Sequence, residues 1–487
     1  QRSSLGEAED EATCSAAGGC EGEYYWPMQK GNFKRTGFSP WQIPTDLSKG
    51  PAWTWVDPND DVIRATPLID EKKNIYLSTV GGRVYKFSPG GQLIWTTFLR
   101  RALPVVGSLY EGSIFLPTKS GQLVAVSMEN GQELWSAQVS ERGVTAGDTA
   151  SVMAINGTII SATHDDPQAV ASGNAFVVAA SAKDGKVLWR FRPDIYVYNF
   201  QGSTPGDGTI VFQDRSGGAY RLSLADGKLI WKSGKQGPGY AHTFTTGAAV
   251  CFGNKVYVVS NIGSNNPLVP SKGVLHVYDV ANGRFLWEQL LDFSANQATA
   301  IGPNPNKPGG HLAVVGIGAN PGVPTILRGG FEAYWTFVTL SVHRMSLWFP
   351  WLFSRPAEAA MEAFDAETGT KLWRLDLPSF QQPATAGDSE RFVRRFTELS
   401  AGMNPYNDLI CLPDSCSQPV VGPDGTAYQG WQDGHIYAVK DANGDGKIDQ
   451  ATEVSKFQVS DGFQGSLGLA PGILAAAPCG GGLYVFN

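Results

Sequence analysis

The sequence is short of charge, and it contains no long run of lysine and arginine. Only 17% of its 487 residues are charged, and the formal net charge is −7. Phosphate recognition depends on clustered basic side chains, so the composition argues against a nucleic-acid partner. A starting methionine and an apolar leader are also missing. The opening QRSSLGEAEDEATCS is therefore expected to be a mature end whose targeting peptide was removed, which predicts export.

Glycine, proline and tryptophan are plentiful instead, with 58, 30 and 14 residues. Such a composition is typical of many turns, short strands and large packed aromatic side chains. The chain is also longer than a usual single domain, so it is either several domains or one body built from repeats.

One short pattern recurs along the chain. Its copies include SPGGQLIW (88–95), MENGQELW (128–135) and AETGTKLW (366–373), and most follow two alternating strand-like segments around a glycine-containing turn. Each unit is therefore predicted to be a short antiparallel sheet whose last strand follows a tight turn. The residues that mark the last strand of successive units are Trp55, Trp95, Trp135, Trp189, Trp231, Trp287, Trp373 and, with phenylalanine in place of tryptophan, Phe457.

The spacing of these marks predicts the fold class. Units of about 40 residues with four strands are typical of propeller blades. The chain ends in GGGLYVFN, a third strand, whereas PAWTWV at residues 51–56 is a fourth strand with no partners before it. We therefore predict an all-β, eight-bladed propeller of four-stranded antiparallel blades over residues 51–487, closed by pairing of the N- and C-terminal strands. Residues 1–50 are expected to be an N-terminal extension and lead-in.

The repeats carry a family resemblance. AFDAETGTKLW (363–373), together with ATPLIDEKKNIYLS and SQPVVGPDGTAYQG, resembles the tryptophan-docking repeats of the pyrroloquinoline-quinone-type eight-bladed propellers. The resemblance covers residues 26–487 and implies the fold. It implies no single activity, because that superfamily includes quinoprotein dehydrogenases and also cofactor-free scaffolds that help assemble outer-membrane barrels.

A quinoprotein is one alternative that the resemblance leaves open. Such enzymes hold the quinone on the propeller axis with calcium, a stacking tryptophan and an aspartate base, and many join two adjacent cysteines. This sequence has no adjacent cysteines and no C-x-x-C-H haem site. Asp165 and Asp166, beside His164, are candidate bases, but a solvated turn explains ATHDDP better. A non-catalytic protein is therefore favoured over an alcohol or sugar dehydrogenase using pyrroloquinoline quinone (PQQ), and a soluble ligand- or glycan-binding propeller is a third alternative.

The irregular steps between marks locate the insertions. With the strands of each blade labelled A to D from the axis outward, extra residues are expected in three B–C connections and one D–A connection. These connections leave a four-stranded blade on the same side, so one face is predicted to be elaborated for binding. The insertions are DDPQAVASGN (165–174), GSNNPLVPSKG (263–273), an aromatic insertion at 318–359 and an inter-blade insertion at 375–416.

The aromatic insertion contains FEAYWTFVTLSVHRMSLWFPWLF, residues 331–353. Soluble surfaces rarely expose so many large apolar side chains. We expect a docking surface for a membrane-embedded partner or an interfacial anchor, with a buried cap over the propeller mouth as the alternative. A transmembrane span is not expected, because His343 and Arg344 interrupt the stretch centrally. The docking residues expected are Trp335, Phe337, Trp348, Phe349, Trp351 and Phe353.

DANGDGKID, residues 441–449, predicts a calcium site. Carboxylate, amide and carbonyl oxygens at this spacing can converge on one hard cation, with Gly446 allowing the sharp turn. The twelfth position is Thr452 where an EF-hand has glutamate, which favours a loop between two strands. That loop joins strands C and D, on the face opposite the insertions, so a structural role is expected. The ligands expected are Asp441, Asn443, Asp445, the Lys447 carbonyl and Asp449.

Two local disulfides are predicted, with free thiols as the alternative, because each pair flanks a short turn-rich segment. Cys251 and Cys479 are expected in nearly equivalent A–B turns three blades apart, too far for a bond between them. The predicted pairs are Cys14 with Cys20 and Cys411 with Cys416.

The sequence thus favours a non-catalytic propeller scaffold outside the cytosol. Periplasm, extracellular space and an organelle lumen such as the thylakoid lumen are the compartments expected. The expected partner is a membrane protein complex, respiratory or photosynthetic, which the chain would serve as an accessory or assembly subunit. Contact with the membrane would be peripheral.

Overall fold

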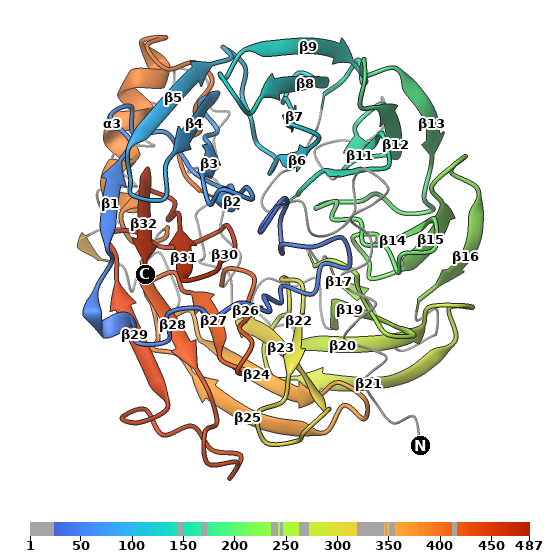
Figure 1. Cartoon of the computed structure of the whole chain (residues 1–487), viewed down its shortest axis with the longest axis vertical. Coiled ribbons are helices and arrows are strands. Elements are labelled where there is room, and N and C mark those ends of the chain that lie inside the picture. The colour runs from blue at the N-terminus through green and yellow to red at the C-terminus, as the bar shows by residue number, and fades with distance from the viewer. Residues whose placement is uncertain are drawn as a thin grey trace.

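The computed structural model describes residues 24–143, 150–166, 173–234, 242–243, 247–262, 272–318, 345, 348–349, 356–382, 384–411 and 416–487. Eight antiparallel sheets stand around a central axis like the blades of a propeller (Figure 1). Consecutive strands pair within each blade, so the innermost strand A leads outward to strand D at the rim. The predicted fold class is confirmed.

The first four blades follow one another along the chain. Blade 1 has β2 (Leu68–Ile69), β3 (Ile75–Ser78), β4 (Arg83–Phe87) and β5 (Leu93–Phe98); blade 2 has β6 (Ser108–Tyr110), β7 (Ser113–Pro117), β8 (Gln122–Ser127) and β9 (Glu133–Gln138). Blade 3 has β10 (Met153–Ile155), β11 (Thr158–Thr163), β12 (Phe176–Ser181) and β13 (Val187–Phe191); blade 4 has β14 (Thr209–Gln213), β15 (Ala219–Ser223) and β16 (Leu229–Ser233). In blade 4, a bridge between Ser203 and Val211 takes the place of strand A.

The next three blades carry the larger connections. Blade 5 has β18 (Val250–Phe252), β19 (Lys255–Ile262), β20 (Lys272–Asp279) and β21 (Phe285–Leu291), with β17 (His242–Thr243) on the far end of β19. Blade 6 has β22 (Ala300–Pro303), β23 (His311–Gly318), β24 (Ala359–Asp365) and β25 (Lys371–Asp376). Blade 7 has β26 (Val420–Val421), β27 (Ala427–Gly430), β28 (His435–Val439) and β29 (Val454–Gln458).

Blade 8 is built from both ends of the propeller. It contains β30 (Gly468–Ala470), β31 (Ile473–Ala476) and β32 (Gly482–Phe486), and its outermost strand is β1 (Trp53–Val56). β1 pairs antiparallel with β32, with Trp53 opposite Val485 and Val56 opposite Gly482. The predicted closure is therefore confirmed. The pairing covers the outer edge of β32, whose backbone groups would otherwise have no strand beside them.

The recurring tryptophan joins each blade to the next. Trp189 on β13 donates its indole N–H to the carbonyl of Leu224, 2.9 Å away in the C–D turn of blade 4. Gly227 in the same turn has φ of 69°, and a Cβ there would lie 2.6 Å from the Trp189 ring. Only glycine combines that backbone conformation with so close an aromatic contact. The repeated Gly-x-x-x-Trp pattern is thus a contact between neighbouring blades.

Burial follows the position of each strand in its blade. Strands B and C, such as β11 and β12, are buried almost throughout because they are covered by the blades on either side. Strands D, such as β9, alternate between exposed and half-buried residues because one side faces solvent. The core is therefore a series of apolar layers between blades, which makes the disc a rigid platform for its connecting loops.

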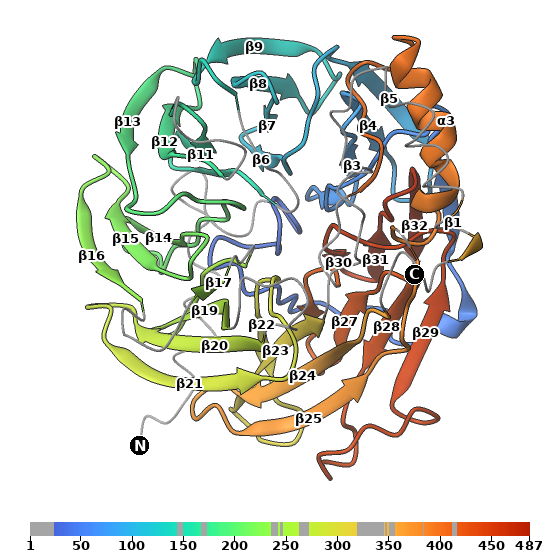
Figure 2. The ribbon, with the colours of Figure 1, turned by 180° about the vertical axis from the view of Figure 1, so that it is seen from behind.

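Two segments outside the blades complete the disc. The stretch that precedes β1 crosses the centre of the ring, where Figure 1 shows it in dark blue, and ends in the short 3-10 helix η2 (Leu47–Lys49). Helix α3 (Asp388–Ser400) lies at the rim beside β5, β1 and β32 in both views (Figures 1 and 2). Sequence reasoning predicted neither position.

Candidate functional site

The loops of the propeller divide between two faces. Because successive strands run in opposite directions, B–C and D–A connections leave the blades on one side, and A–B and C–D turns leave on the other. The two longest connections, residues 319–358 between β23 and β24 and residues 377–419 between β25 and β26, begin and end at strand ends on the first side. So do the B–C connections 164–175 and 263–271. We call this side the insertion face and the other side the turn face.

Exposed apolar side chains lie in the aromatic insertion. Trp348 is 71% exposed and Phe349 is 43% exposed, and Met345, whose carbonyl accepts the Phe349 N–H at 2.8 Å, is also exposed. These two aromatic residues belong to the predicted docking set. The other four, Trp335, Phe337, Trp351 and Phe353, lie outside the described residues. Docking through this segment therefore stays a prediction.

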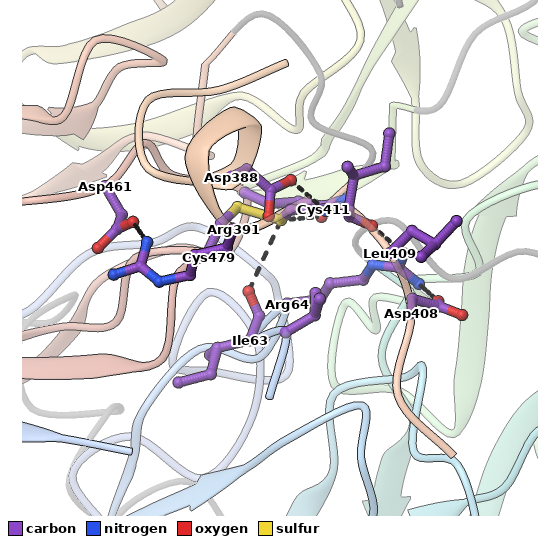
Figure 3. The surroundings of a disulfide bond; sticks show 12 residues. Ile63, Arg64, Asp388, Arg391, Asp408, Leu409, Cys411, Asp461 and Cys479 are labelled. Carbon is purple, nitrogen blue, oxygen red and sulfur yellow. Dashed lines mark hydrogen bonds and ion pairs between the residues drawn. A yellow bond between two sulfur atoms is a disulfide. The ribbon is translucent and has the colours of Figure 1, made fainter. Parts of the chain in front are cut away.

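The inter-blade insertion forms a clamp across the closing blade. We define the closure clamp as residues 384–411, which contain α3. Arg391 forms an ion pair with Asp461 (Figure 3) and also contacts Asp60 at 2.9 Å, so one side chain joins the start of the propeller to its end. Asn407 accepts the backbone N–H of Val62 at 2.9 Å. The clamp thus holds together the two parts of the chain that meet in blade 8.

The buried charges of the clamp depend on each other. Arg395 and Asp388 are both fully buried and form an ion pair, and Arg395 also lies 3.4 Å from Asp60. Burial raises the pKa of Asp388 to about 6, against the opposing effect of Arg395. Burial also raises the pKa of Asp60, again opposed by Arg395 and Arg391. Both carboxyl groups would be costly to keep charged here without their arginines.

A disulfide anchors the clamp, and it corrects the predicted pairing. Cys411 bonds Cys479, with Cα atoms 5.8 Å apart, so the pair Cys411–Cys416 is wrong (Figure 3). Cys479 lies between β31 and β32, a B–C connection and not the predicted A–B turn, and therefore shares the insertion face with Cys411. Cys416 is buried in blade 7, where its backbone forms a β-bridge with Trp431, and it takes no part in this disulfide.

The remaining cysteine predictions have separate outcomes. Cys251 is a buried free thiol, so the prediction that it does not bond Cys479 is confirmed by the bond of Cys479 to Cys411. Cys14 and Cys20 lie outside the described residues.

The candidate bases form structural ion pairs. Asp165 contacts Arg190 at 2.6 Å and Asp166 contacts Arg192 at 2.6 Å, both within blade 3. Nδ1 of His164 lies 3.0 Å from the carbonyl oxygen of Gly173. These groups hold the B–C connection of blade 3 to strand β13 and its continuation, so their position agrees with a structural role.

The propeller axis does not fit a quinone. The resemblance would place that cofactor on the axis, but here Lys30 and Arg35 lie there, both fully buried, with their cationic groups bonded to backbone carbonyls of the surrounding blades. Trp26, Met28 and Gln29 of the same segment are buried as well. The chain itself therefore occupies the expected cofactor position, and we derive no chemistry through a quinone.

The predicted calcium loop joins β28 to β29 on the turn face. Its carboxylate oxygens accept backbone N–H groups: those of Asp441 from Gly444 at 2.8 Å and Gly446 at 3.1 Å, and one of Asp445 from Lys447 at 2.8 Å. Glu453, which was not among the predicted ligands, accepts the backbone N–H of Asp449 at 2.9 Å. Across the described residues, no group of three or more acidic, histidine or cysteine side chains is arranged to hold a metal. Calcium binding stays a prediction.

We expect titration to decide whether this loop rearranges around calcium. If it does, millimolar calcium should raise the melting temperature, and a chelator should reverse the rise, because an ion bound only to the folded state stabilises it. Asp445→Asn should weaken the effect at least tenfold. Asp226→Asn, which alters an exposed carboxylate in the C–D turn of blade 4, is the matched control and should leave it unchanged. Absence of binding heat at millimolar calcium would rule the site out.

Comparison with known proteins gives one family. A family model described as "Outer membrane protein assembly factor BamB" matches residues 52–164 and 149–315, together more than half of the chain. A protein of that name from Yersinia pestis is 25% identical over 181 residues, which are 37% of this chain and 42% of that protein. The match thus spans less than half of that relative's length.

Solved structures agree on the propeller. BamB from Moraxella catarrhalis has a TM-score of 0.56 at 12% identity, covering 90% of this chain and 99% of that one. Quinohemoprotein alcohol dehydrogenase from Comamonas testosteroni has a TM-score of 0.60 at 12% identity, covering 95% and 80%. At such low identity the likeness shows the fold alone. Within the described residues, no helix is long and apolar enough to cross a membrane.

Proposed function

Since the chain belongs to the family described as outer membrane protein assembly factor BamB, we propose that it is a propeller scaffold that docks onto a membrane protein complex as an accessory or assembly subunit. The disc presents loops on a rigid ring, an arrangement suited to binding proteins. The compartment that goes with this role is outside the cytosol, at the periphery of a membrane.

The insertion face supports this proposal best. It carries the two longest connections, and one of them exposes Trp348 and Phe349 next to each other. Large aromatic side chains are enriched among the residues that contribute most to protein–protein binding. The closure clamp fixes the other long connection by a disulfide and buried ion pairs, so that part of the face is rigid before a partner arrives.

Three classes of partner follow from the proposal. The relative's name refers to the assembly of outer membrane proteins, which makes an assembly machine for such proteins the first to test. Respiratory and photosynthetic complexes are the other two. A dehydrogenase role has less support, because the axis is filled by the chain's own residues.

The double variant Trp348→Ser with Phe349→Ser tests the docking surface. We expect it to bind the membrane complex at least tenfold more weakly than the wild type, because loss of aromatic anchors at an interface costs about 2 kcal/mol or more. The measurement is native electrophoresis of gently solubilised source membranes, followed by titration of the purified complex.

Leu188→Ser is the matched control. Leu188 is 52% exposed, but it lies on β13 at the rim, away from the connecting loops. This variant should bind like the wild type and melt at nearly the same temperature. If the double variant also binds like the wild type, docking does not use this segment, and the proposed surface is wrong.

A further inference from the structure

The segment before β1 is bound by every blade of the propeller. We call residues 24–42 the axial segment. Its backbone or side chains form hydrogen bonds with the inner part of each blade in turn. The partners, from blade 1 to blade 8, are Trp26 with Ile69, Pro27 with Leu109, Arg35 with Val152, Phe33 with Thr204, Lys34 with Cys251, Thr36 with Ile301, Gly37 with Val421 and Gln42 with Gly472, at 2.8 to 3.2 Å.

Both ends of the axial segment lie on the turn face. The hydroxyl of Tyr24 accepts the N–H of Gly112 in the A–B turn of blade 2, at 2.9 Å. The carbonyl of Gln42 accepts the N–H of Gly472 in the A–B turn of blade 8, at 2.8 Å. The segment therefore enters and leaves the central space between the innermost strands, here called the channel, from the same side.

Two of its three cationic side chains, those of Lys30 and Arg35, reach the other end of the channel. Lys30 donates to the carbonyl of Pro419 at 2.5 Å, just before β26, and Arg35 donates to the carbonyl of Gly202 at 2.9 Å, just before the inner bridge of blade 4. Arg35 also donates to Gln29 at 2.6 Å. An innermost strand begins at the insertion face, where the D–A connection leads into it. The Lys30 and Arg35 side chains therefore reach partners near the insertion face, although the segment itself enters from the turn face.

The backbone conformation and the buried charges of the axial segment would be unfavourable in free energy without the ring around it. Lys30 and Arg35 have φ of 66° and 61°, in the left-handed region that residues with a Cβ seldom adopt. Both are fully buried and, among the described residues, no acidic group forms an ion pair with either or shifts its pKa. Burial lowers the pKa of Arg35 to about 9, and burial together with Arg35 lowers that of Lys30. Such a conformation persists only when its surroundings hold it in place.

We propose that the axial segment is a built-in ligand of the propeller: the ring binds it non-covalently in the channel, and the ring depends on it to stay closed. The channel is therefore a peptide-binding site whose occupant is residues 24–42 of the same chain. Partners then bind to the outer surfaces of the disc. This inference does not depend on the docking function proposed above.

Cutting the folded protein tests this directly. Thr45 and Asp46 are exposed, so a protease recognition sequence can be inserted between them in the full chain and cleaved after folding. We expect the N-terminal fragment to stay with the ring during size-exclusion chromatography and to leave only when the ring unfolds. Release of the fragment from a ring that remains folded would overturn the proposal.

A pair of variants adds the role of the buried cations. With Arg35→Met, four hydrogen bonds to the blades and to Gln29 are lost, and the cut fragment should leave at least ten times faster than in the wild type. Lys34→Met is the matched control, since the hydrogen bond of Lys34 to the blades is made by its backbone carbonyl, which the substitution keeps. The cut fragment of this variant should stay bound to the ring. Equal retention in both variants would contradict the role of Arg35. If Arg35→Met does not fold, the uncut and cut wild-type proteins still decide the proposal.

Discussion

Replacing Cys411 and Cys479 together by alanine is expected to lower the free energy of unfolding by about 4 kcal/mol. The bond closes a loop with a sequence separation of 68 residues, and the chain-entropy model assigns a stabilisation of that size to such a loop. Equilibrium unfolding in denaturant, with and without a reductant, measures the change. The reductant should have little further effect on the double variant.

Cys251→Ala is the control for the loss of a buried sulfur without a cross-link. It removes a fully buried thiol in blade 5 and should cost about 1 kcal/mol. Peptide mapping under non-reducing conditions should find Cys411 linked to Cys479. A peptide that links Cys411 to Cys416, or equal stability losses in the two variants, would contradict the assigned bond.

Arg395→Met should be the most damaging single substitution in the closure clamp. It leaves Asp388 and Asp60 buried without their common arginine, and removing one partner of a buried ion pair costs about 3–5 kcal/mol. We expect a fall of that size in the free energy of unfolding. Loosening of α3, followed by hydrogen exchange, should accompany it.

Arg394→Met is the matched control, one residue earlier on the same helix. Its side chain is 58% exposed; it pairs with Glu398 at 2.9 Å and makes only a long contact, 3.7 Å, with Asp60. Exposed pairs of this kind contribute about 0–1 kcal/mol, so its stability should be close to that of the wild type. If both variants lose equal stability, the buried pair does not hold the clamp.

The ring could be predicted because the sequence signals for each blade lie close together in the chain and recur from blade to blade. Each blade carries its own glycine-containing turn and tryptophan, and these are the groups that contact one another between blades. Closure could be predicted as well, since a strand without predecessors at PAWTWV matches a blade without an outermost strand at GGGLYVFN. Neither conclusion needed a long-range contact.

The disulfide and the axial segment could not be predicted, because their partners lie far away along the chain. Cys479 lies between β31 and β32, just before GGGLYVFN, and assigning it to an A–B turn instead of this B–C connection placed it on the wrong face. The residues that bond Lys30 lie 268 and 389 positions later. A lysine and an arginine in KGNFKRTG (30–37) look like ordinary surface residues until the fold places them on the axis.

The most direct test of the docking proposal is to map where the membrane complex touches the disc. Cross-linking mass spectrometry on the complex in source membranes gives that map. Our account predicts that cross-links from integral membrane proteins fall on the insertion face, close to Trp348 and to the exposed side of α3. Cross-links confined to the turn face, or a protein that is recovered only as a free monomer, would contradict it.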